Sequence, residues 1–593
     1  MIQPKKKVWI FTFEYAGVVK VGGLGEVPAN QAKHLAGIFD ITVLMPSHGQ
    51  LERLKEKYSY KKLNYCCSGL INSSYFGDSA FESTYQIAFY EFKIENVKII
   101  VLTGENDFTS TYLDDKTVYS PSTIMGKICL FSIGIRGIVD FILEHERNLI
   151  PDLVHMHDYH VVMSFINLKQ VFSQRGLEVP GIITIHLLTY PKFDLSFYKL
   201  CGIDNTPLKI TLQKGIESLN INEIYHLALS SNESIPTVEK LGAVVSDLVT
   251  TVSESYLKSD IIPNCGNELI QFKTDFIWDG CDWDYDEIMK VVHRNHQIEL
   301  SNYFNTQSSK KFSREDLKTF LLTFKIGNLN QSPLISSQKV LDAINEISNG
   351  NGFIKNGTIK AFSEIGPLVL TTGRISPQKG FEVIFEALPN IVKNIPDIKF
   401  LFLLLPTDYS LYEIKFYSKF VKEFPNNIRI IFGVASDIYY LAHICADVYC
   451  ALSRWEPFGI MALEAMAAKI PIIATKVGGL QETIIDVREY PDTGTGILIE
   501  KNNPDQFSVA LVSLLKALEV SKKAQLTSDD ILNDHELLRI TNQIPDEVIK
   551  SKVLLNRNYF TSIQDNCYKR VKENFTWNKV SQKLSALYLK MLK

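Results

Sequence analysis

Residues 453–482 constrain the fold and the chemistry of this 593-residue chain more than any other stretch. Their spacing predicts a turn and then a helix that carries Glu464 two turns beyond Glu456. The apolar run Ile470–Thr475 predicts a buried strand, and the glycine pair at 478–479 predicts a turn into a further helix. Backbone amides at a helix N-terminus bind anions. The stretch therefore offers carboxylates for sugar hydroxyls and amides for phosphate, which are the two halves of a nucleotide-sugar.

Length and charge narrow the class of protein. A chain of 593 residues is too long for one hydrophobic core, so two large domains are expected. Hydrophobic residues make up 46% of the chain and charged residues 22%, which is the balance of a globular protein. The 62 Lys and Arg residues against 66 Asp and Glu residues give a net charge of −4. This charge lacks the basic footprint of a nucleic-acid-binding protein, so no nucleic-acid partner is expected.

The cysteine pattern and the apolar runs indicate a compartment. The nine cysteines form no Cys-x-x-Cys pair and no regular framework, which favours free thiols in a reducing environment. The first residues run directly into an apolar stretch and lack a signal-peptide cleavage pattern. Apolar runs such as Lys399–Leu405 are too short to span a bilayer. We therefore expect a cytoplasmic protein with no membrane partner.

Apolar runs alternate with helical stretches almost from end to end, which predicts an α/β fold with two doubly wound, mostly parallel sheets. The runs that predict buried strands are Val8–Phe13, Ile41–Pro46, Lys98–Thr103, Asp152–Met156, Gly181–His186, Leu248–Val252, Leu368–Thr372, Lys399–Leu405, Arg429–Phe432, Asp447–Ala451, Ile470–Thr475 and Gly496–Ile499. We expect Rossmann-like domains at 1–275 and 276–575. Polar segments at about 297–362 and 520–560 are interpreted as insertions on the second domain. Residues 576–593 predict an amphipathic helix that packs back on the body.

Charged and polar residues follow several of these strands. Ligands of open α/β sheets bind beyond the carboxyl ends of the strands. Lys20-Val-Gly-Gly-Leu follows the first strand, Asp158 and His186 follow two others, and Arg374 follows the first strand of the second half. We therefore expect these residues to lie on the ligand-binding rims of their sheets.

Two cationic motifs suit a diphosphate. Lys20 precedes Gly22 and Gly23 at a helix start, which combines a charge with free amides, although a tight turn with a solvated lysine explains the same residues. Arg374 and Lys379 bracket a turn into a helix and can clamp the phosphates of a leaving nucleoside diphosphate. Removing one preorganised donor of this kind costs about 3–4 kcal/mol.

The two glutamates do not form the carboxylate pair of a glycosidase. Glu464 lies eight residues beyond Glu456, roughly 12 Å along a helix at about 1.5 Å per residue. A hydrolase pair is separated by about 5–9.5 Å. Both residues can instead line one elongated ligand, while a carboxylate stabilised by the helix dipole is the structural alternative for Glu464.

The histidine-rich segment His155-Met-His157-Asp158-Tyr-His160 raises the question of a metal site. No Cys or Glu cluster completes a tetrahedral set nearby, and Arg and Lys can hold the phosphates without a metal. We therefore expect buried supporting histidines, no metal and no cofactor. His186 ends its strand and is predicted to face the ligand, with a hydrogen-bonded core histidine as the alternative.

Together these motifs resemble the glycogen/starch synthase family, and the archaeal-type glycogen synthases most of all. The motifs that carry the resemblance, in the order of the family, are Phe13-Glu14-Tyr15, Lys20-Val-Gly-Gly-Leu, Pro46-Ser-His-Gly49, His155-Met-His-Asp158, Thr184-Ile-His186, Arg374 with Lys379, Glu456-Pro-Phe-Gly, Glu464 and Gly478-Gly-Leu480. The resemblance implies a GT-B fold, with two Rossmann-like domains facing across a cleft. It also implies retaining, metal-free transfer of α-glucosyl units from ADP-glucose or UDP-glucose to the non-reducing end of an α-1,4-glucan.

The resemblance also implies roles for single residues. His186 would hold the glucose 6-hydroxyl, and Asp158 would line the acceptor side. Glu456 would bind the glucose 3- and 4-hydroxyls, and Glu464 would bind the ribose. The groups implied to meet the phosphates are the Lys20 side chain, the Gly22 and Gly23 amides, the Arg374 and Lys379 side chains, and the amides of Gly478, Gly479 and Leu480.

This chain departs from many family members at three positions. Leu187 stands where an Asn is common, Phe458 where a Cys is common, and Val434 where a Tyr meets the nucleotide ring. Two alternatives stay open: a related GT-B transferase with a different acceptor, and a catalytically weak regulatory protein that binds glucan or nucleotide. A pyridoxal-phosphate phosphorylase is a further formal alternative. Donor base, acceptor length, the role of both insertions, allosteric control and the oligomeric state, a homo-oligomer included, are left open.

Overall fold

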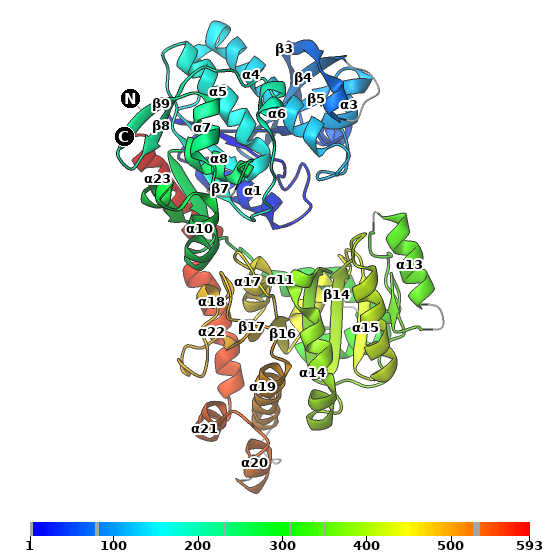
Figure 1. The fold of residues 1–593 in the computed structure, drawn as a ribbon. Coiled ribbons are helices and arrows are strands. Elements are labelled where there is room, and N and C mark those ends of the chain that lie inside the picture. Colours follow the sequence, from blue (N-terminus) through cyan, green and yellow to red (C-terminus); the bar gives the residue numbers. More distant parts are fainter. Residues whose placement is uncertain are drawn as a thin grey trace. The chain divides into compact units, whose positions relative to one another are not determined.

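The computed structural model describes residues 4–76, 82–230, 233–307, 310–335, 337–348, 351–525 and 534–593. The chain divides into two compact units. Unit 1 comprises Met1–Gly280 with Trp577–Lys593, and unit 2 comprises Cys281–Thr576 (Figure 1). Within the described ranges, no helix is both long and apolar enough to cross a bilayer.

Unit 1 is built on a nine-stranded sheet in the order β11-β10-β7-β6-β1-β2-β5-β4-β3. The strands are β1 (Lys7–Phe11), β2 (Asp40–Pro46), β3 (Tyr60–Ile71), β4 (Ser83–Ile94), β5 (Val97–Gly104), β6 (Leu153–His157), β7 (Gly181–Ile185), β10 (Leu248–Thr251) and β11 (Thr274–Phe276). The strands from β11 to β5 pair in parallel, whereas β4 and β3 pair antiparallel at one edge. This hairpin was not predicted, because exposed and partly buried residues alternate along β3 and leave no apolar run.

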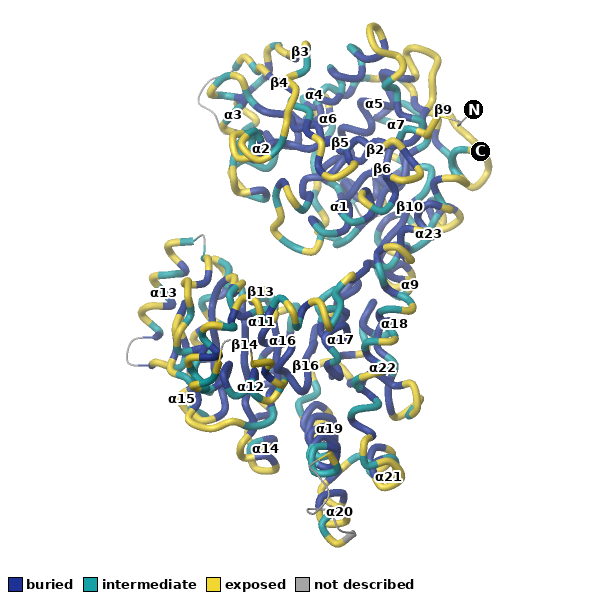
Figure 2. The backbone as a smooth tube through the Cα atoms, turned by 180° about the vertical axis from the view of Figure 1, so that it is seen from behind, coloured by how far each residue is buried: buried dark blue, intermediate teal, exposed yellow. Residues whose placement is uncertain are grey.

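Helices cover this sheet and bury its apolar strands. The helices of unit 1 are α1 (Gly23–Leu35), α2 (Leu51–Lys57), α3 (Asp107–Leu113), α4 (Ile124–His145), α5 (Val162–Gln174), α6 (Leu195–Leu200), α7 (Ile221–Leu227), α8 (Val238–Val245), α9 (Glu254–Tyr256), α10 (Ile262–Cys265) and α23 (Trp577–Met591). A separate hairpin joins β8 (Leu208–Leu212) to β9 (Gly215–Leu219). Figure 2 shows β2, β5 and β6 as buried.

Unit 2 has a seven-stranded, wholly parallel sheet in the order β12-β15-β14-β13-β16-β17-β18. The strands are β12 (Ile354–Lys355), β13 (Leu368–Arg374), β14 (Lys399–Leu405), β15 (Ile428–Phe432), β16 (Val448–Ala451), β17 (Ile472–Thr475) and β18 (Gly496–Ile499). Six of them overlap the predicted strands of the second half. The mostly parallel α/β architecture predicted from the apolar runs is confirmed.

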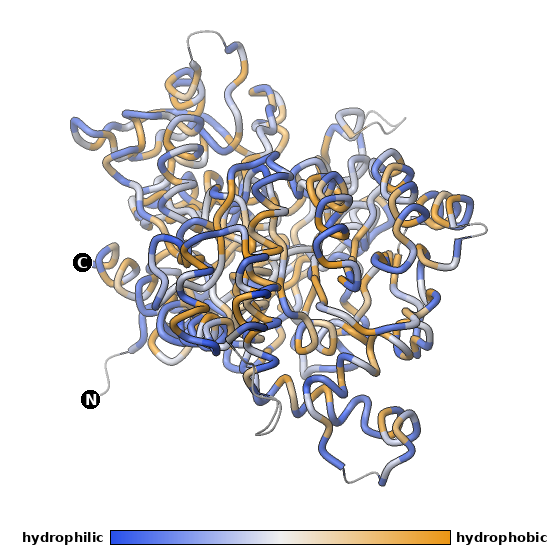
Figure 3. The backbone as a smooth tube through the Cα atoms, turned by 90° about the horizontal axis from the view of Figure 1, so that it is seen from below, coloured by the Kyte–Doolittle hydropathy of each residue, from blue (hydrophilic) through white to orange (hydrophobic). Residues whose placement is uncertain are grey.

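The helices of unit 2 alternate with these strands and continue beyond them. They are α11 (Tyr285–Tyr303), α12 (Arg314–Thr323), α13 (Gln338–Ser348), α14 (Phe381–Asn394), α15 (Leu411–Glu423), α16 (Tyr439–Cys445), α17 (Ile460–Ala467), α18 (Leu480–Thr483), α19 (Pro504–Gln525), α20 (Asp534–Thr541), α21 (Glu547–Leu555) and α22 (Tyr559–Asn574). Figure 3 shows hydrophobic and hydrophilic stretches alternating along many helices, as expected where one face packs on a sheet.

The two polar segments interpreted as insertions contain regular structure. The first contributes α12, α13 and the edge strand β12, and the second contributes α20 and α21. Residues 308–309, 336, 349–350 and 526–533 of these segments lie outside the described residues. Arg429 fixes the end of the first segment, because its guanidinium lies 4.3 Å from the Phe353 ring centre and 4.1 Å from that of Phe362. It also donates to the Lys360 carbonyl at 2.6 Å.

The C-terminal helix α23 belongs to unit 1, where it packs on α1. Its buried residues include Val580, Leu584 and Tyr588. The Tyr588 hydroxyl lies 2.7 Å from His155 Nδ1, and His155 Nε2 lies 2.7 Å from the Thr184 hydroxyl. The last helix of the chain therefore supports the interior of the sheet from which β6 and β7 carry their rim residues.

A buried ion pair organises the amino end of β16. Both carboxylate oxygens of Asp447 accept from Lys318 Nζ, at 2.8 and 2.7 Å, and Arg314 contributes a second cation at 3.2 Å. The Leu368 amide also donates to Asp447, at 2.7 Å. Burial acts to raise the pKa of Asp447, but Lys318 and Arg314 hold it well below its ordinary value. The pair therefore attaches α12 to the start of two central strands.

Asp447→Asn should destabilise unit 2 by about 3–5 kcal/mol, because it leaves the buried Lys318 and the partly buried Arg314 without their countercharge. Urea unfolding followed by a probe within unit 2 measures the change. The matched control is Glu315→Gln, which removes an exposed carboxylate 3.6 Å from Lys318 Nζ and should cost less than about 1 kcal/mol. Equal losses in the two variants would contradict this account of the pair.

Candidate functional site

Three predicted motifs of unit 1 lie at the carboxyl ends of adjacent strands. The Lys20 loop follows β1, Asp158 follows β6 and His186 follows β7, and these strands are neighbours in the order β7-β6-β1. The structure therefore brings the three motifs to one rim of the sheet, where parallel α/β sheets bind ligands.

A buried carboxylate holds the loop that follows β1. Glu14 Oε2 accepts from the amides of Val21, at 2.6 Å, and of Gly22, at 3.0 Å, while Oε1 accepts from the Tyr119 hydroxyl. Glu14 is only 2% exposed. The Gly22 amide, which the resemblance assigns to the diphosphate, thus has an acceptor inside the protein. This role of Glu14 was not predicted, although an acidic residue directly after an apolar strand is a signal of one.

The loop nevertheless presents cationic and amide groups to a ligand. Lys20 is about half exposed, and its Nζ lies 2.5 Å from Glu26 Oε1. Gly23 is the first residue of α1, and the first amides of a helix have no acceptor within the helix. Lys20 and Gly23 therefore remain the members of this motif that suit an anion.

Asp158 binds the backbone of His186. Its Oδ1 accepts from the His186 amide at 2.7 Å, and its own amide donates to the Thr184 carbonyl at 2.9 Å. Asp158 has a φ of 62°, in the left-handed region that non-glycine residues rarely adopt. The resemblance implies that Asp158 lines the acceptor side; in the structure its buried carboxylate fixes the start of the loop after β7.

Two more buried side chains, which the sequence analysis missed, hold the rest of this loop. The Tyr256 hydroxyl accepts from the Leu188 amide at 2.9 Å. Glu239 Oε1 accepts from the amides of Thr189, at 3.1 Å, and Tyr190, at 3.0 Å. Nothing in the sequence close to His186 indicates these partners, because they lie on separate elements about 50 or more residues further along.

The histidines of this rim are neutral at physiological pH. Burial lowers the pKa of His186 to about 3 and that of His155 to about 3, and it lowers the pKa of His157 well below its ordinary value. His157 Nδ1 lies 2.9 Å from His186 Nε2, so one ring donates and the other accepts. Such neutral rings suit hydrogen bonds to hydroxyls. Among the described residues, no group of three or more His, Cys, Asp or Glu side chains is placed to hold a metal ion.

Unit 2 gathers the remaining predicted residues on its own rim. Arg374 ends β13, and Lys379 lies in the short turn that follows it. Glu456 follows β16, and the Gly-Gly-Leu turn at 478–480 follows β17. Because β13, β16 and β17 are consecutive in the sheet, these motifs share one edge.

Lys379 and Glu456 form an ion pair at this edge of the sheet. Lys379 Nζ lies 2.6 Å from Glu456 Oε2, which also accepts from the Ser453 hydroxyl at 3.0 Å. Both charged side chains are largely buried, at 15% and 10% exposure. Arg374 is exposed, and no ion pair to it is found among the described residues. The cations Arg374 and Lys379 and the carboxylate of Glu456 thus lie at the ends of the neighbouring strands β13 and β16.

The glycine turn is fitted around the backbone of Glu456. Gly478 has a φ of 45°, and a Cβ built there would lie 1.8 Å from the Glu456 carbonyl oxygen. The Gly479 amide donates to that carbonyl at 3.1 Å, and the Leu480 amide donates to Val477 at 3.1 Å. Two of the three amides that the resemblance assigns to phosphate therefore bond within the protein. The turn's evident role is to position Glu456.

Glu464 lies on α17 and is half-buried. Its Oε2 accepts from the Tyr439 hydroxyl of α16 at 2.9 Å. Val434, which the resemblance places at a nucleotide-facing position, is 51% exposed and follows β15 on the same rim. Tyr439 was missed by the sequence analysis, because no pattern links it to Glu464.

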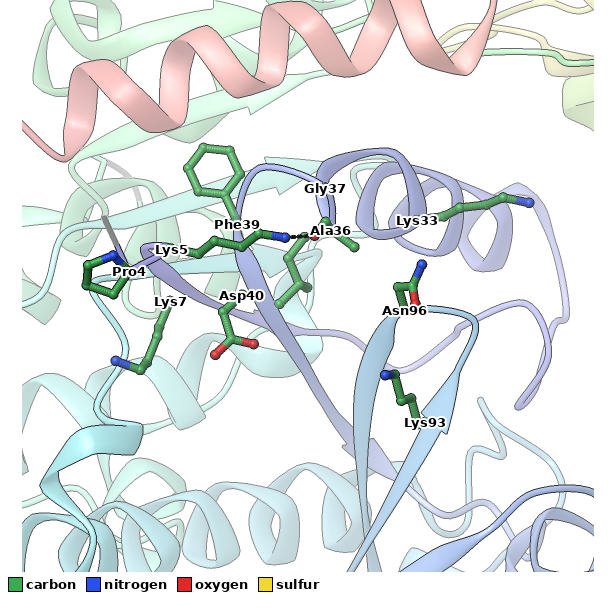
Figure 4. A pocket seen from close by; sticks show the side chains of 11 residues that line it. Pro4, Lys5, Lys7, Lys33, Ala36, Gly37, Phe39, Asp40, Lys93 and Asn96 are labelled. Carbon is green, nitrogen blue, oxygen red and sulfur yellow. Dashed lines mark hydrogen bonds between the residues drawn. The ribbon is translucent and has the colours of Figure 1, made fainter. Parts of the chain in front are cut away.

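A cavity of about 530 Å³ lies at the opposite edge of the unit 1 sheet, at the amino ends of β1 and β2 (Figure 4). Its charged lining residues are Lys5, Lys7, Lys33, Asp40 and Lys93. Lys5 Nζ donates to the Ala36 carbonyl at 2.7 Å. None of the predicted site residues lines this cavity, so it is not part of the candidate site.

Asp158 should make stability depend on pH in a defined direction. Burial raises its pKa from 3.8 to about 7. Because the folded chain then binds this proton more tightly, the stabilisation is complete below pH 4 and is lost as the pH rises through 7. At about 1.4 kcal/mol per pKa unit, the free energy of unfolding of the natural chain should fall by a few kcal/mol relative to Asp158→Asn across this range. Denaturant titrations of both proteins at several pH values test this, and parallel profiles would contradict it.

Comparisons with known proteins give matches within both units. The model of the starch synthase catalytic domain matches residues 7–271, and that of glycosyl transferases group 1 matches residues 358–526. A glycogen synthase of Geotalea daltonii is 21% identical over 527 residues, which cover 86% of this chain and 91% of that protein. One of Thermodesulfovibrio yellowstonii is 25% identical over 343 residues, 57% of each chain, so this match spans just over half of that relative.

A solved structure extends the likeness to the whole fold. The catalytic domain of starch synthase IV from Arabidopsis thaliana, bound to ADP and acarbose, matches with a TM-score of 0.64 at 17% identity and covers 100% of both chains. Its similarity concerns the fold alone. The two family matches, on successive parts of the chain, show that it is similar to starch synthase catalytic domains in unit 1 and to group 1 glycosyl transferases in unit 2, and its fold is GT-B.

Proposed function

We propose that the protein transfers α-glucosyl units, with retention, from ADP-glucose or UDP-glucose to the non-reducing end of an α-1,4-glucan. The observation that carries the proposal is the rim of unit 2, where Lys379 and Glu456 are paired at 2.6 Å beside Arg374. A sugar pyrophosphate needs cations for its phosphates and a carboxylate for its hydroxyls, and this rim offers both within one sheet edge.

In this proposal Arg374 and Lys379 bind the diphosphate and stabilise its charge as it leaves. Preorganised cations act most strongly where charge develops in the transition state. Glu456 binds the 3- and 4-hydroxyls of glucose, and Glu464 binds the ribose. When phosphate arrives, Lys379 is shared between it and Glu456, so the same lysine joins the sugar-binding and phosphate-binding groups.

Within unit 1, the residues that we propose for substrate binding are His186, Lys20, Gly23 and Asp158. The neutral His186 ring binds the glucose 6-hydroxyl, while Asp158, Tyr256 and Glu239 hold the following loop. In the reaction, the bond between the anomeric carbon and the phosphate oxygen breaks, and a bond from the acceptor hydroxyl forms on the same face. The acceptor proton passes to the leaving phosphate, so no protein nucleophile is required.

We place this activity in the cytoplasm, since all nine cysteines are free thiols. The assignment to the archaeal-type subgroup stays a prediction. A transferase with a small acceptor is the second candidate, because Leu187, Phe458 and Val434 depart from the family pattern close to the sugar and base positions.

A matrix of donors and acceptors tests the proposal. The purified full chain is incubated with radiolabelled ADP-glucose or UDP-glucose and with glycogen, maltotriose or no acceptor, and incorporated glucose is measured. We expect incorporation into glycogen and stepwise elongation of maltotriose. Transfer only to a non-glucan acceptor, or nucleotide binding without any incorporation, would overturn the glucan synthase proposal.

Lys379→Ala and Glu456→Ala should each lower turnover by about two decades or more, because each removes a preorganised charge from the reacting centre. Lys393→Ala, which removes an exposed lysine from the end of α14, is the matched control and should keep turnover within twofold. Circular dichroism confirms that each variant is folded. Near-normal turnover in either site variant would remove that residue from the mechanism.

A further inference from the structure

Three buried aromatic rings connect the C-terminal helix to the candidate residue His186. Tyr588 of α23 and the β6 residues His155 and His157 are each 0% exposed. The Tyr588 hydroxyl lies 2.7 Å from His155 Nδ1, and the ring centres of His155 and His157 lie 4.3 Å apart. His157 Nδ1 lies 2.9 Å from His186 Nε2. A continuous series of contacts therefore ends at the ligand-binding rim of unit 1.

The direction of each hydrogen bond around His155 follows from its neighbours. The Thr250 hydroxyl donates to the Ile183 carbonyl at 3.2 Å, so its oxygen accepts from the Thr184 hydroxyl at 2.7 Å. The Thr184 oxygen then accepts from His155 Nε2 at 2.7 Å. A neutral imidazole carries one proton, so His155 Nδ1 accepts from the Tyr588 hydroxyl. His155 is therefore held in one tautomer.

The ring proton of His157 lies on Nδ1. Burial lowers the pKa of His157 well below its ordinary value, so the ring is neutral and carries one proton. Its Nε2 is buried and has no hydrogen-bond partner among the described residues. For backbone groups, a buried N–H without an acceptor is rarer than an unsatisfied acceptor. The same order applied to the ring leaves Nε2 unprotonated and makes Nδ1 the donor to His186 Nε2.

This donor determines which nitrogen of His186 can meet a ligand. The His186 ring is also neutral, because burial lowers its pKa to about 3. A neutral ring that accepts at Nε2 carries its proton on Nδ1. His186 is only partly buried, and in the part of the chain that the structure describes its Nδ1 has no hydrogen-bond partner. The nitrogen that remains for a ligand is therefore a donor.

We propose that His157 is a positioning residue that holds His186 as the Nδ1-protonated tautomer, so that His186 donates a hydrogen bond to a hydroxyl of the transferred sugar. The inference rests on the proposed function, which assigns His186 to the glucose 6-hydroxyl. A single tautomer is ready to donate in every molecule, whereas two tautomers would divide the protein into competent and incompetent fractions. A hydroxyl that accepts from His186 also keeps its own proton for a second acceptor.

Tyr588 offers a matched control. Its hydroxyl bonds to His155, which contacts His157 ring to ring. Tyr588→Phe removes one buried hydrogen bond but leaves both partners of the bond between His157 and His186 in place. His157→Phe keeps an aromatic ring but removes the donor to His186. A merely structural role would respond to both substitutions, whereas the proposed role responds to the loss of His157 only.

The first readout is the ring-nitrogen NMR spectrum of the full chain, made with isotope-labelled histidine and measured without ligand. The signals of His186 are identified by their absence in His186→Gln. We expect the natural chain to show a protonated Nδ1 and an unprotonated Nε2 for His186. His157→Phe should show both tautomers, because the donor that selects one of them is gone. Tyr588→Phe should retain the natural pattern.

The second readout is kcat/KM for glucose transfer to glycogen. His157→Phe should lower it by about tenfold or more, because the ring of His186 loses both its tautomer and its orientation. His157→Asn supplies an amide N–H close to the position of the lost Nδ1 and should stay within about threefold of the natural chain. Tyr588→Phe should also stay within about threefold. Circular dichroism confirms that each variant is folded.

A natural chain in which His186 carries its proton on Nε2, or shows both tautomers, overturns the inference without the need for any variant. A folded His157→Phe with the natural tautomer or the natural kcat/KM overturns it as well, and so does His157→Asn if it is as slow as His157→Phe. A change of tautomer in Tyr588→Phe as large as that in His157→Phe would show a merely structural effect. If the natural chain transfers no glucose, the proposed function fails, while the spectra still decide whether His157 positions His186.

Discussion

The pair formed by Lys379 and Glu456 is the interaction on which the candidate site depends. These two residues lie 77 positions apart in the chain, and the parallel sheet of unit 2 brings them to adjacent strand ends. The glycine at 478 leaves room for the Glu456 carbonyl, and Ser453 fixes the carboxylate. A lysine held in this way is placed before any ligand arrives. Folding therefore fixes the orientation of Lys379 before a ligand binds.

Unit 1 uses a related device, in which buried acids and a tyrosine bind backbone amides. Glu14 holds the loop after β1, Asp158 holds the start of the loop after β7, and Glu239 holds its continuation. Loops at the ends of parallel strands otherwise have free amides, and a buried carboxylate that accepts two of them restricts their motion. The same contacts decide which amides remain for a ligand. In this loop the Gly22 amide already donates to Glu14, whereas the Gly23 amide remains for a ligand.

The sequence predicts the parts of this molecule that have local patterns. Continuous apolar runs predicted β13, β14 and β17, and the amphipathic pattern of residues 576–593 predicted a helix where α23 lies. The β3–β4 hairpin was not predicted, because one of its faces is exposed. The hydrogen-bond partners of the site residues were not predicted either, since Glu14 and Tyr119 lie 105 positions apart and no local period connects them. The candidate residues could thus be named from the sequence, whereas their hydrogen bonds follow only from the folded sheet.

The most direct test of the central claim is a crystal structure of the full chain with ADP or UDP bound. The account predicts that the diphosphate oxygens lie within hydrogen-bonding distance of the Arg374 guanidinium and of Lys379 Nζ, with Glu456 left for the sugar. A diphosphate bound away from both cations would contradict the account, even if the protein proved to be active.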